Sequence, residues 1–93
     1  MKMIDLEFFG YAAGILGVVA WAPQFRKVWI DKRYEGVSIP TLLLVIITLS
    51  MWVIYGISLS ASAIIWSNIA AIAIISSIMI GVMRLQREEV ISD

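Results

Sequence analysis

The chain has 93 residues, of which 61% are hydrophobic and 15% charged, and its mean hydropathy is +0.95. A soluble domain has about 45–50% apolar and about 25% charged residues, so this composition is typical of a membrane protein. Seven basic and seven acidic residues cancel, which leaves no basic surface for nucleic acid, and the absence of cysteine and histidine excludes disulfides and the usual zinc sites.

Uncharged stretches of the sequence predict three membrane-spanning helices. The first runs from Phe8 to Phe25, 18 residues or about 27 Å as a helix, which nearly matches a hydrocarbon core of about 30 Å. The second runs from Gly36 to Met83, 48 residues, which is enough for two crossings, and small polar residues at 58–62 predict a tight turn between them. We therefore expect an all-α membrane protein with one domain, whose spans cover about 8–28, 39–59 and 62–83, followed by a hydrated tail at 85–93.

The start of the chain also imitates a cleaved secretory signal, because a basic residue, Lys2, precedes an apolar run that ends in small residues. Three features oppose cleavage. Asp5 and Glu7 stand where a signal would be positively charged, the apolar run is long for a signal, and Pro23 would be the first residue after the cleavage site. We therefore interpret this segment as a retained span.

Basic residues near the span ends predict the orientation in the membrane, since they gather on the cytoplasmic side. Six lie in the connection after the first span or in the tail after the third, namely Arg26, Lys27, Lys32, Arg33, Arg84 and Arg87. One, Lys2, precedes the first span, and none lies between the second and third spans. The N-terminus is therefore expected outside, and the C-terminus in the cytoplasm.

The few polar residues within the spans suggest a binding site. Thr48, Trp52 and Tyr55 are spaced i, i+4, i+7, so they share one face of the second span, and Asn68 of the third span lies at about the same depth as Trp52. An amide beside a broad apolar indole suits an uncharged molecule with several hydroxyls, such as a sugar. The residues alone leave an alternative open, in which Asn68 bonds to a neighbouring helix and Trp52 faces lipid or the core.

The first span contains Ala22-Pro23-Gln24 near its cytoplasmic end. Pro23 cannot donate to the carbonyl of Val19 and bends the helix, while Gln24 can bond a freed backbone group. This pattern fits either a moving hinge or a static kink. Helical spacing places Gly10, Gly14, Gly17, Trp21 and Gln24 on one face of the same span, and the stretch from Gly10 to Gly14 predicts close approach of another helix.

What the spans lack also limits the function. Within residues 8–25 and 36–83 the only titratable side chains are Tyr11 and Tyr55. No carboxylate is therefore available there to couple transport to protons or sodium. Hydrolytic or transfer chemistry has no candidate catalytic residue, because no histidine, cysteine or pair of carboxylates can activate a hydroxyl. We expect no enzyme activity and no cofactor or metal.

An odd number of spans makes a single copy a poor transporter, since three helices leave no room for a polar solute between them. Identical chains inserted in the same orientation are related by an axis along the membrane normal. Two copies would give six helices in two parallel halves, an arrangement known among transporters, with binding sites at the interface of the halves.

The order and spacing of several motifs resemble the SemiSWEET family of bacterial half-transporters, within the PQ-loop proteins. The motifs cover nearly the whole chain: Pro23-Gln24, then Glu35-Gly36-Val37-Ser38-Ile39-Pro40, then Trp52-x-x-Tyr55-Gly56, and Asn68 sixteen residues after Trp52. The resemblance implies a three-helix bundle with the third helix between the first and second (order 1-3-2), acting as a parallel homodimer in the bacterial inner membrane. It also implies uncoupled alternating access for a mono- or disaccharide.

Residue by residue, the resemblance implies that Trp52 and Asn68 bind the substrate, that Pro23 and Gln24 form the hinge, and that Tyr55 forms the extracellular gate. Some relatives carry a charged pair just after the Tyr-Gly element, whereas this chain reads Ile57-Ser58-Leu59-Ser60-Ala61. The outer gate is therefore expected to close without an ion pair. Two other functions remain as alternatives, a channel-like pore and a membrane subunit that binds another protein without transporting.

Overall fold

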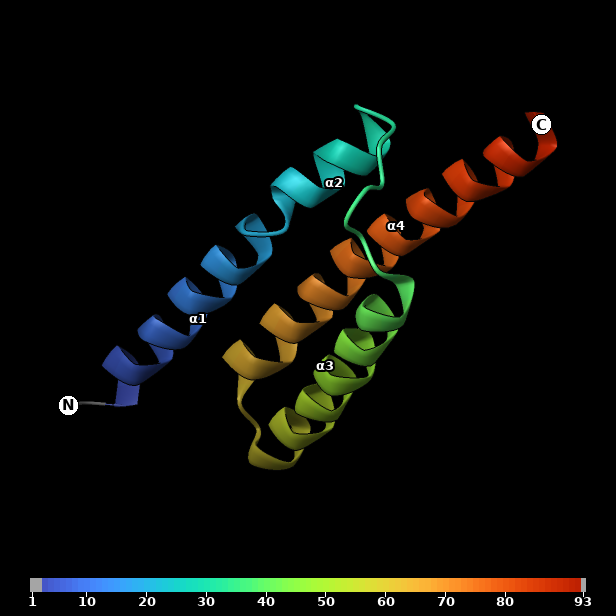
Figure 1. The fold of residues 1–93 in the computed structure, drawn as a ribbon. Coiled ribbons are helices and arrows are strands. Elements are labelled where there is room, and N and C mark those ends of the chain that lie inside the picture. Colours follow the sequence, from blue (N-terminus) through green and yellow to red (C-terminus); the bar gives the residue numbers. More distant parts are fainter. Residues whose placement is uncertain (1–2, 93) are drawn as a thin grey trace.

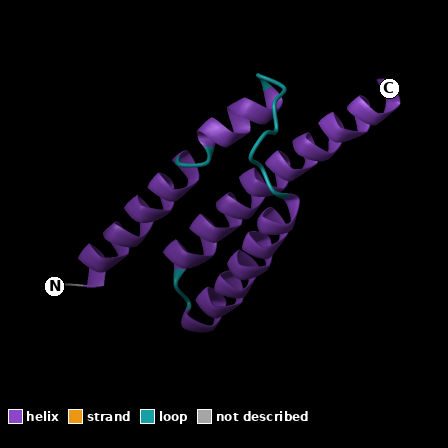
Figure 2. Cartoon of the chain, in the orientation of Figure 1, coloured by secondary structure: helices purple, strands orange, loops and turns teal. Residues whose placement is uncertain are grey.

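The structure is a computed structural model that describes residues 3–92. These residues are helical apart from short connections (Figures 1 and 2). The helices are α1 (Met3–Val19), α2 (Ala22–Trp29), α3 (Ile39–Leu59) and α4 (Ser62–Ser92). Lys2, the basic residue predicted on the outer side, lies outside the described residues.

Three helical segments are long and apolar enough to cross a membrane. The first is Glu7–Trp29, which contains most of α1 and all of α2. The other two are Ile39–Leu59, which is α3, and Ser62–Ile91, which is nearly all of α4. At about 1.5 Å per residue, the 31 residues of α4 span about 46 Å, well beyond a hydrocarbon core of about 30 Å. The tail expected after residue 85 therefore continues α4 as its last turns.

The first span is interrupted rather than continuous. α1 ends at Val19 and α2 begins at Ala22, with a turn at Ala20 and Trp21 between them. The Trp21 N–H donates to the Val18 carbonyl at 3.0 Å, a tighter bond than the α-helical one, and Pro23 lies in the first turn of α2. Proline is tolerated in the first turn of a helix, because a backbone N–H at that position has no partner within the helix. The bend predicted at Pro23 is therefore a break in the helix just before it.

The predicted turn between the second and third spans is confirmed. α3 begins after Ser38, whose Oγ accepts from the Thr41 N–H at 3.3 Å, and ends at Leu59. Ser60 follows with a left-handed backbone (φ 54°), and the Ala61 N–H closes the turn by donating to the Gly56 carbonyl at 2.9 Å. The chain then enters α4 at Ser62.

α4 packs against α3, against α1 and against α2. Small residues allow the close approach of α1: a Cβ atom on Gly10 would lie 3.0 Å from the Ala63 Cβ, and one on Gly14 would lie 2.3 Å from the Ser67 Cβ. Gly17, on the same face by its spacing, has nothing within 4 Å of such an atom, so the close approach involves the stretch from Gly10 to Gly14.

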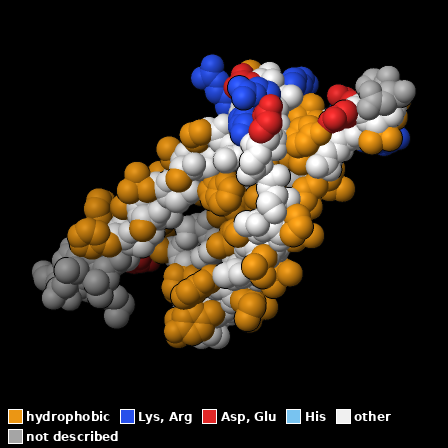
Figure 3. Space-filling model, viewed as in Figure 1, with side chains coloured by type: hydrophobic (Ala, Val, Ile, Leu, Met, Phe, Trp, Pro, Cys, Tyr) orange, Lys and Arg blue, Asp and Glu red, His pale blue; other side chains and the backbone are white. Residues whose placement is uncertain are grey.

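The buried apolar core lies toward the α2–α3 connection. It consists of five side chains that are 4% exposed or less, namely Val28, Leu42, Ile75, Ile78 and Val82. Trp21 and Trp29 pack against it. Most other large apolar side chains are exposed and cover the middle of the bundle, while charged side chains gather mainly beside the α2–α3 connection and the end of α4 (Figure 3). A surface of this kind suits lipid or a second copy of the chain.

Candidate functional site

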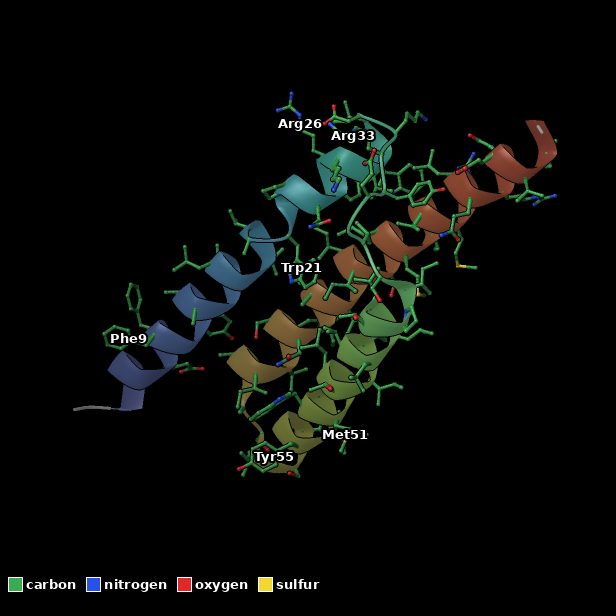
Figure 4. The ribbon with its side chains drawn as sticks, in the orientation of Figure 1. Phe9, Trp21, Arg26, Arg33, Met51 and Tyr55 are labelled. Atoms are coloured by element: carbon green, nitrogen blue, oxygen red, sulfur yellow. The ribbon has the colours of Figure 1, made fainter. Side chains whose placement is uncertain are left out.

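An aromatic pair on α3 forms the clearest binding feature. The rings of Trp52 and Tyr55 meet edge to face, with centroids 5.7 Å apart and an interplanar angle of 79°. Trp52 is 48% exposed and Tyr55 52% exposed. With Thr48 and Met51 they line an open pocket of about 380 Å³ on one face of α3, as the spacing of Thr48, Trp52 and Tyr55 predicts (Figure 4).

The polar atoms of this pocket are few and uncharged. The Thr48 Oγ1 donates to the Leu44 carbonyl of its own helix at 2.9 Å. The pocket thus offers broad, apolar ring surfaces with a hydroxyl at each end, from Thr48 and Tyr55. Such a surface can stack against the C–H face of a neutral, polyhydroxylated molecule, and it has no charge to attract an ion.

Asn68 lies on α4, half-buried, and is not among the residues that line the Trp52 pocket. Its Nδ2 donates to the Ile64 carbonyl one turn earlier in the same helix, at 2.7 Å. The described hydrogen bond is therefore within α4 and does not join two helices. It uses one of the two amide N–H groups. The single chain brings Trp52 and Tyr55 together, but it does not bring Asn68 into the same pocket.

Pro23 and Gln24 lie in the first turn of α2, next to the interruption of the first span. Pro23 is exposed, whereas the Gln24 side chain turns inward. Its Oε1 is fully buried and has no hydrogen-bond donor within the part of the chain that the structure describes. An unpaired buried acceptor costs free energy, so this amide marks a strained point beside the break.

The Trp29 side chain connects α2 to α4, and this contact was not predicted from the sequence. Its indole N–H donates to the Ser77 carbonyl at 2.9 Å, and the Arg84 guanidinium lies 5.7 Å from the ring centroid. Gly81 makes room for the ring, since a Cβ atom there would lie 3.0 Å from two of its atoms and 2.5 Å from Val28 Cγ1. One sequence signal could have indicated this contact, namely the small residues Ala73, Ser77 and Gly81, which are spaced four apart along α4.

Polar contacts tie the α2–α3 connection to α2 and to α4. The Tyr34 hydroxyl donates to Glu89 Oε2 of α4, and the Lys27 Nζ of α2 donates to the Glu35 carbonyl. Arg33 forms an ion pair with Glu35, with Nε and Oε2 3.3 Å apart. These contacts hold the connection against the ends of α2 and α4.

Contacts within this connection raise the pKa of Tyr34 and lower the pKa of Glu35. The hydrogen bond to Glu89 is the main cause that raises the pKa of Tyr34, assisted by partial loss of water and by the charges of Glu89 and Glu35. A hydrogen bond from its own backbone is the main cause that lowers the pKa of Glu35, assisted by Arg33 and Lys27. Both shifts favour the protonation states that keep these contacts at neutral pH.

No cluster of three or more acidic, histidine or cysteine side chains that could hold a metal ion occurs among the described residues.

Comparisons with known proteins agree with the membrane architecture. The model of the PQ loop repeat family matches residues 6–65. The chain is similar to the "Sugar transporter SemiSWEET" of Bradyrhizobium diazoefficiens, with 29% identity over 79 residues, covering 85% of this chain and 92% of that protein. No solved structure matches the chain.

Proposed function

The chain belongs to the PQ-loop family, and we propose that it is a facilitative sugar transporter that works by alternating access as a parallel homodimer. The similarity to a protein named as a sugar transporter supports the substrate class. The observation that carries the proposal is the half-exposed Trp52 ring beside Tyr55, in an uncharged pocket on a membrane-spanning helix.

A homodimer explains why the single chain is incomplete. Few side chains are buried, and large apolar residues are exposed along α1 and α3. Trp52 and Asn68 lie on different helices and do not line a common pocket in one copy. We propose that a second copy, related by an axis along the membrane normal, completes a sugar site from both Trp52 rings and both Asn68 amides. The contacts of α4 with α1, α2 and α3 support the helix order 1-3-2.

In the proposed site, the sugar stacks one C–H face on Trp52 and bonds its hydroxyls to Asn68. The Asn68 Nδ2 already donates one bond to the Ile64 carbonyl, which orients the amide. A sugar hydroxyl would then bond to the second N–H and to the oxygen. Because no charged residue lies between 36 and 83, the substrate is neutral and crosses without a coupled ion.

The moving parts are proposed at the two ends of this site. Pro23 and Gln24 form the hinge, supported by the helix break before Pro23 and by the buried, unpaired Oε1 of Gln24. Tyr55 forms the extracellular gate, since it borders the Trp52 pocket on the side of the α3–α4 turn. The basic residues of the α2–α3 connection and of the end of α4 support a cytoplasmic position for that end of the bundle, in a bacterial inner membrane.

Uptake of labelled glucose and sucrose into liposomes that contain the purified chain tests this function. We expect saturable uptake that is unchanged by a pH gradient. Trp52→Ala and Asn68→Ala should abolish it. Ile54→Ala is the matched control, because Ile54 is 69% exposed on α3 but does not line the Trp52 pocket, and it should leave uptake unchanged.

Three outcomes would contradict the proposal. Non-saturable flux or ionic conductance would indicate a channel-like pore. Absence of flux from a folded, homogeneous preparation would indicate a subunit that acts only with another protein. Undiminished uptake by the Asn68→Ala variant would remove Asn68 from the site.

A further inference from the structure

A groove on the outer face of α4 combines apolar and basic side chains. It is lined by Ile80, Met83, Arg84 and Arg87 and has a volume of about 370 Å³. Ile80 and Met83 are each 52% exposed, so they have no protein partner that covers them within the described chain. We call this surface the α4 arginine groove. It lies outside the sugar site proposed above and shares no residue with it.

The position of the groove along α4 corresponds to the boundary between hydrocarbon and headgroups. Arg84 is 22 residues after Ser62, or about 33 Å along the helix, and a hydrocarbon core is about 30 Å thick. With Ser62 at the opposite surface, Ile80 lies about 27 Å along the helix, within the hydrocarbon, and Met83 lies at its boundary. Arg84 and Arg87 then lie at the level of the phosphates.

Arg84 is held in place by its neighbours. Its guanidinium lies 5.7 Å from the centre of the Trp29 ring, and that ring is fixed by the bond from its indole N–H to the Ser77 carbonyl. A cation that stacks on an aromatic ring keeps its N–H donors free for an oxyanion at the edge of the guanidinium. The stacking therefore positions Arg84 without using its hydrogen-bond donors.

Among the described residues, neither arginine of the groove forms an ion pair. In the part of the chain that the structure describes, the ion pair is the one between Arg33 and Glu35, and no carboxylate lies within 4.0 Å of either arginine of the groove. On the other side of Arg84, a small cavity of about 50 Å³ is lined by Arg84 together with one further basic residue, Lys32, and one acidic residue, Glu88. A net positive site remains beside an apolar surface.

From this juxtaposition we propose that the α4 arginine groove binds an anionic phospholipid, with its phosphate between Arg84 and Arg87 and an acyl chain along Ile80 and Met83. Charge complementarity selects an anionic headgroup, and the apolar half of the groove selects a lipid over a free anion. Basic pockets at the cytoplasmic side of membrane helices bind anionic lipid headgroups in this manner.

Native mass spectrometry of the full chain in detergent tests this site, with phosphatidylglycerol, phosphatidylcholine and inorganic phosphate as probes. We expect phosphatidylglycerol to bind more tightly than phosphatidylcholine. Arg84→Gln and Arg87→Gln should each raise the Kd for phosphatidylglycerol about fivefold, and neither should change the Kd for phosphatidylcholine. Circular dichroism and size-exclusion elution confirm that each variant is folded.

Arg26→Gln is the matched control, because it removes the same charge from the same end of the bundle, where Arg26 points away from the helices (Figure 4). We expect it to leave the Kd unchanged. An equal rise of the Kd in this control would overturn the proposal in favour of diffuse attraction to the basic end. Equal affinities for the two lipids would overturn it as well. Displacement of phosphatidylglycerol by inorganic phosphate at an equal concentration would show a site for a free anion instead.

Discussion

Gly14 of α1 meets Ser67 of α4 so closely that a Cβ atom on the glycine would lie 2.3 Å from the Ser67 Cβ. No pair of carbon atoms tolerates that distance, so any side chain at Gly14 must push the two helices apart. Turning the Ser67 side chain does not relieve this contact, because rotation about its Cα–Cβ bond moves Oγ and leaves Cβ in place. This contact sets how closely the first span lies against α4.

The first prediction is that Gly14→Ala destabilises the fold by about 1–3 kcal/mol, the usual cost of overpacking. The free energy of unfolding is measured in detergent by tryptophan fluorescence. Gly17→Ala is the control on the same helix, because nothing lies within 4 Å of the added Cβ. It should be neutral or stabilising by up to about 1 kcal/mol, since alanine favours helix over glycine. Equal effects of the two substitutions would contradict the close contact.

The two glycines also illustrate how much of the fold can be predicted from the sequence. Their spacing places both on one face of α1, and this local geometry is set by the helix period. The distance to the partner helix is not local. α4 lies against Gly14 but comes within 4 Å of no Cβ atom built on Gly17, and a pocket of about 290 Å³, lined in part by Val18 and Ala70, lies between the two helices.

The candidate site also has one part that the sequence predicts and another that it does not. The Trp52–Tyr55 contact follows from a separation of three residues in one helix, which the sequence predicts. The bond from Trp29 to Ser77 joins residues 48 apart, and it depends on how α2 turns after the break. The relation of Asn68 to Trp52 depends on the rotation of two helices and, in our proposal, on a second copy. No periodicity in the sequence determines those quantities.

A second prediction concerns the buried Oε1 of Gln24. Gln24→Leu removes an acceptor that has no donor, so it should stabilise the described conformation by about 1 kcal/mol. If the amide bonds to another group in the opposite conformation, the same substitution should reduce sugar uptake. Unfolding and liposome uptake are both measured. Gln86→Leu, an exposed site on α4, is the control and should change neither. Destabilisation by Gln24→Leu would show that the amide is satisfied.

A third prediction concerns the break before α2. Pro23→Ala restores an N–H that can bond to the Val19 carbonyl and join α1 to α2 as one helix. Since proline costs about 3 kcal/mol in a helix interior, uptake should fall at least about tenfold through slower interconversion, with sugar affinity changed much less. Pro40→Ala is the control, because Pro40 lies in the first turn of α3. A loss of affinity equal to the loss of rate would place Pro23 in the sugar site.

A fourth prediction concerns the outer gate. Because no charged residue lies between 36 and 83, closure at Tyr55 should not depend on salt, even when the Debye length falls from about 10 Å at 0.1 M to about 3 Å at 1 M. Spin labels at the exposed Ser60 of both copies report the distance across the gate. Opening of the gate at high salt would reveal an ion pair that closes it.

The fifth prediction concerns the contact between Tyr34 and Glu89, which ties the α2–α3 connection to α4. The pKa of Tyr34 in the folded chain is raised above its usual value of 10.0, chiefly by this hydrogen bond. A raised pKa means that the stabilisation is fully present below pH 10 and is lost as the pH rises through the folded value. The connection should therefore stay attached at neutral pH and detach only in strong alkali.

Ultraviolet absorbance of tyrosinate measures this pKa, as the difference between the parent chain and Tyr34→Phe. The difference titration should have its midpoint above 10, and Glu89→Gln should bring it back toward 10, because it removes the charge and the strongest acceptor. Glu88→Gln is the control, one residue away on α4, and should leave the midpoint where it was. A midpoint at or below 10 in the parent chain would mean that the Tyr34 hydroxyl does not donate to Glu89, and that the polar contacts of Lys27, Arg33 and Glu35 hold the connection without it.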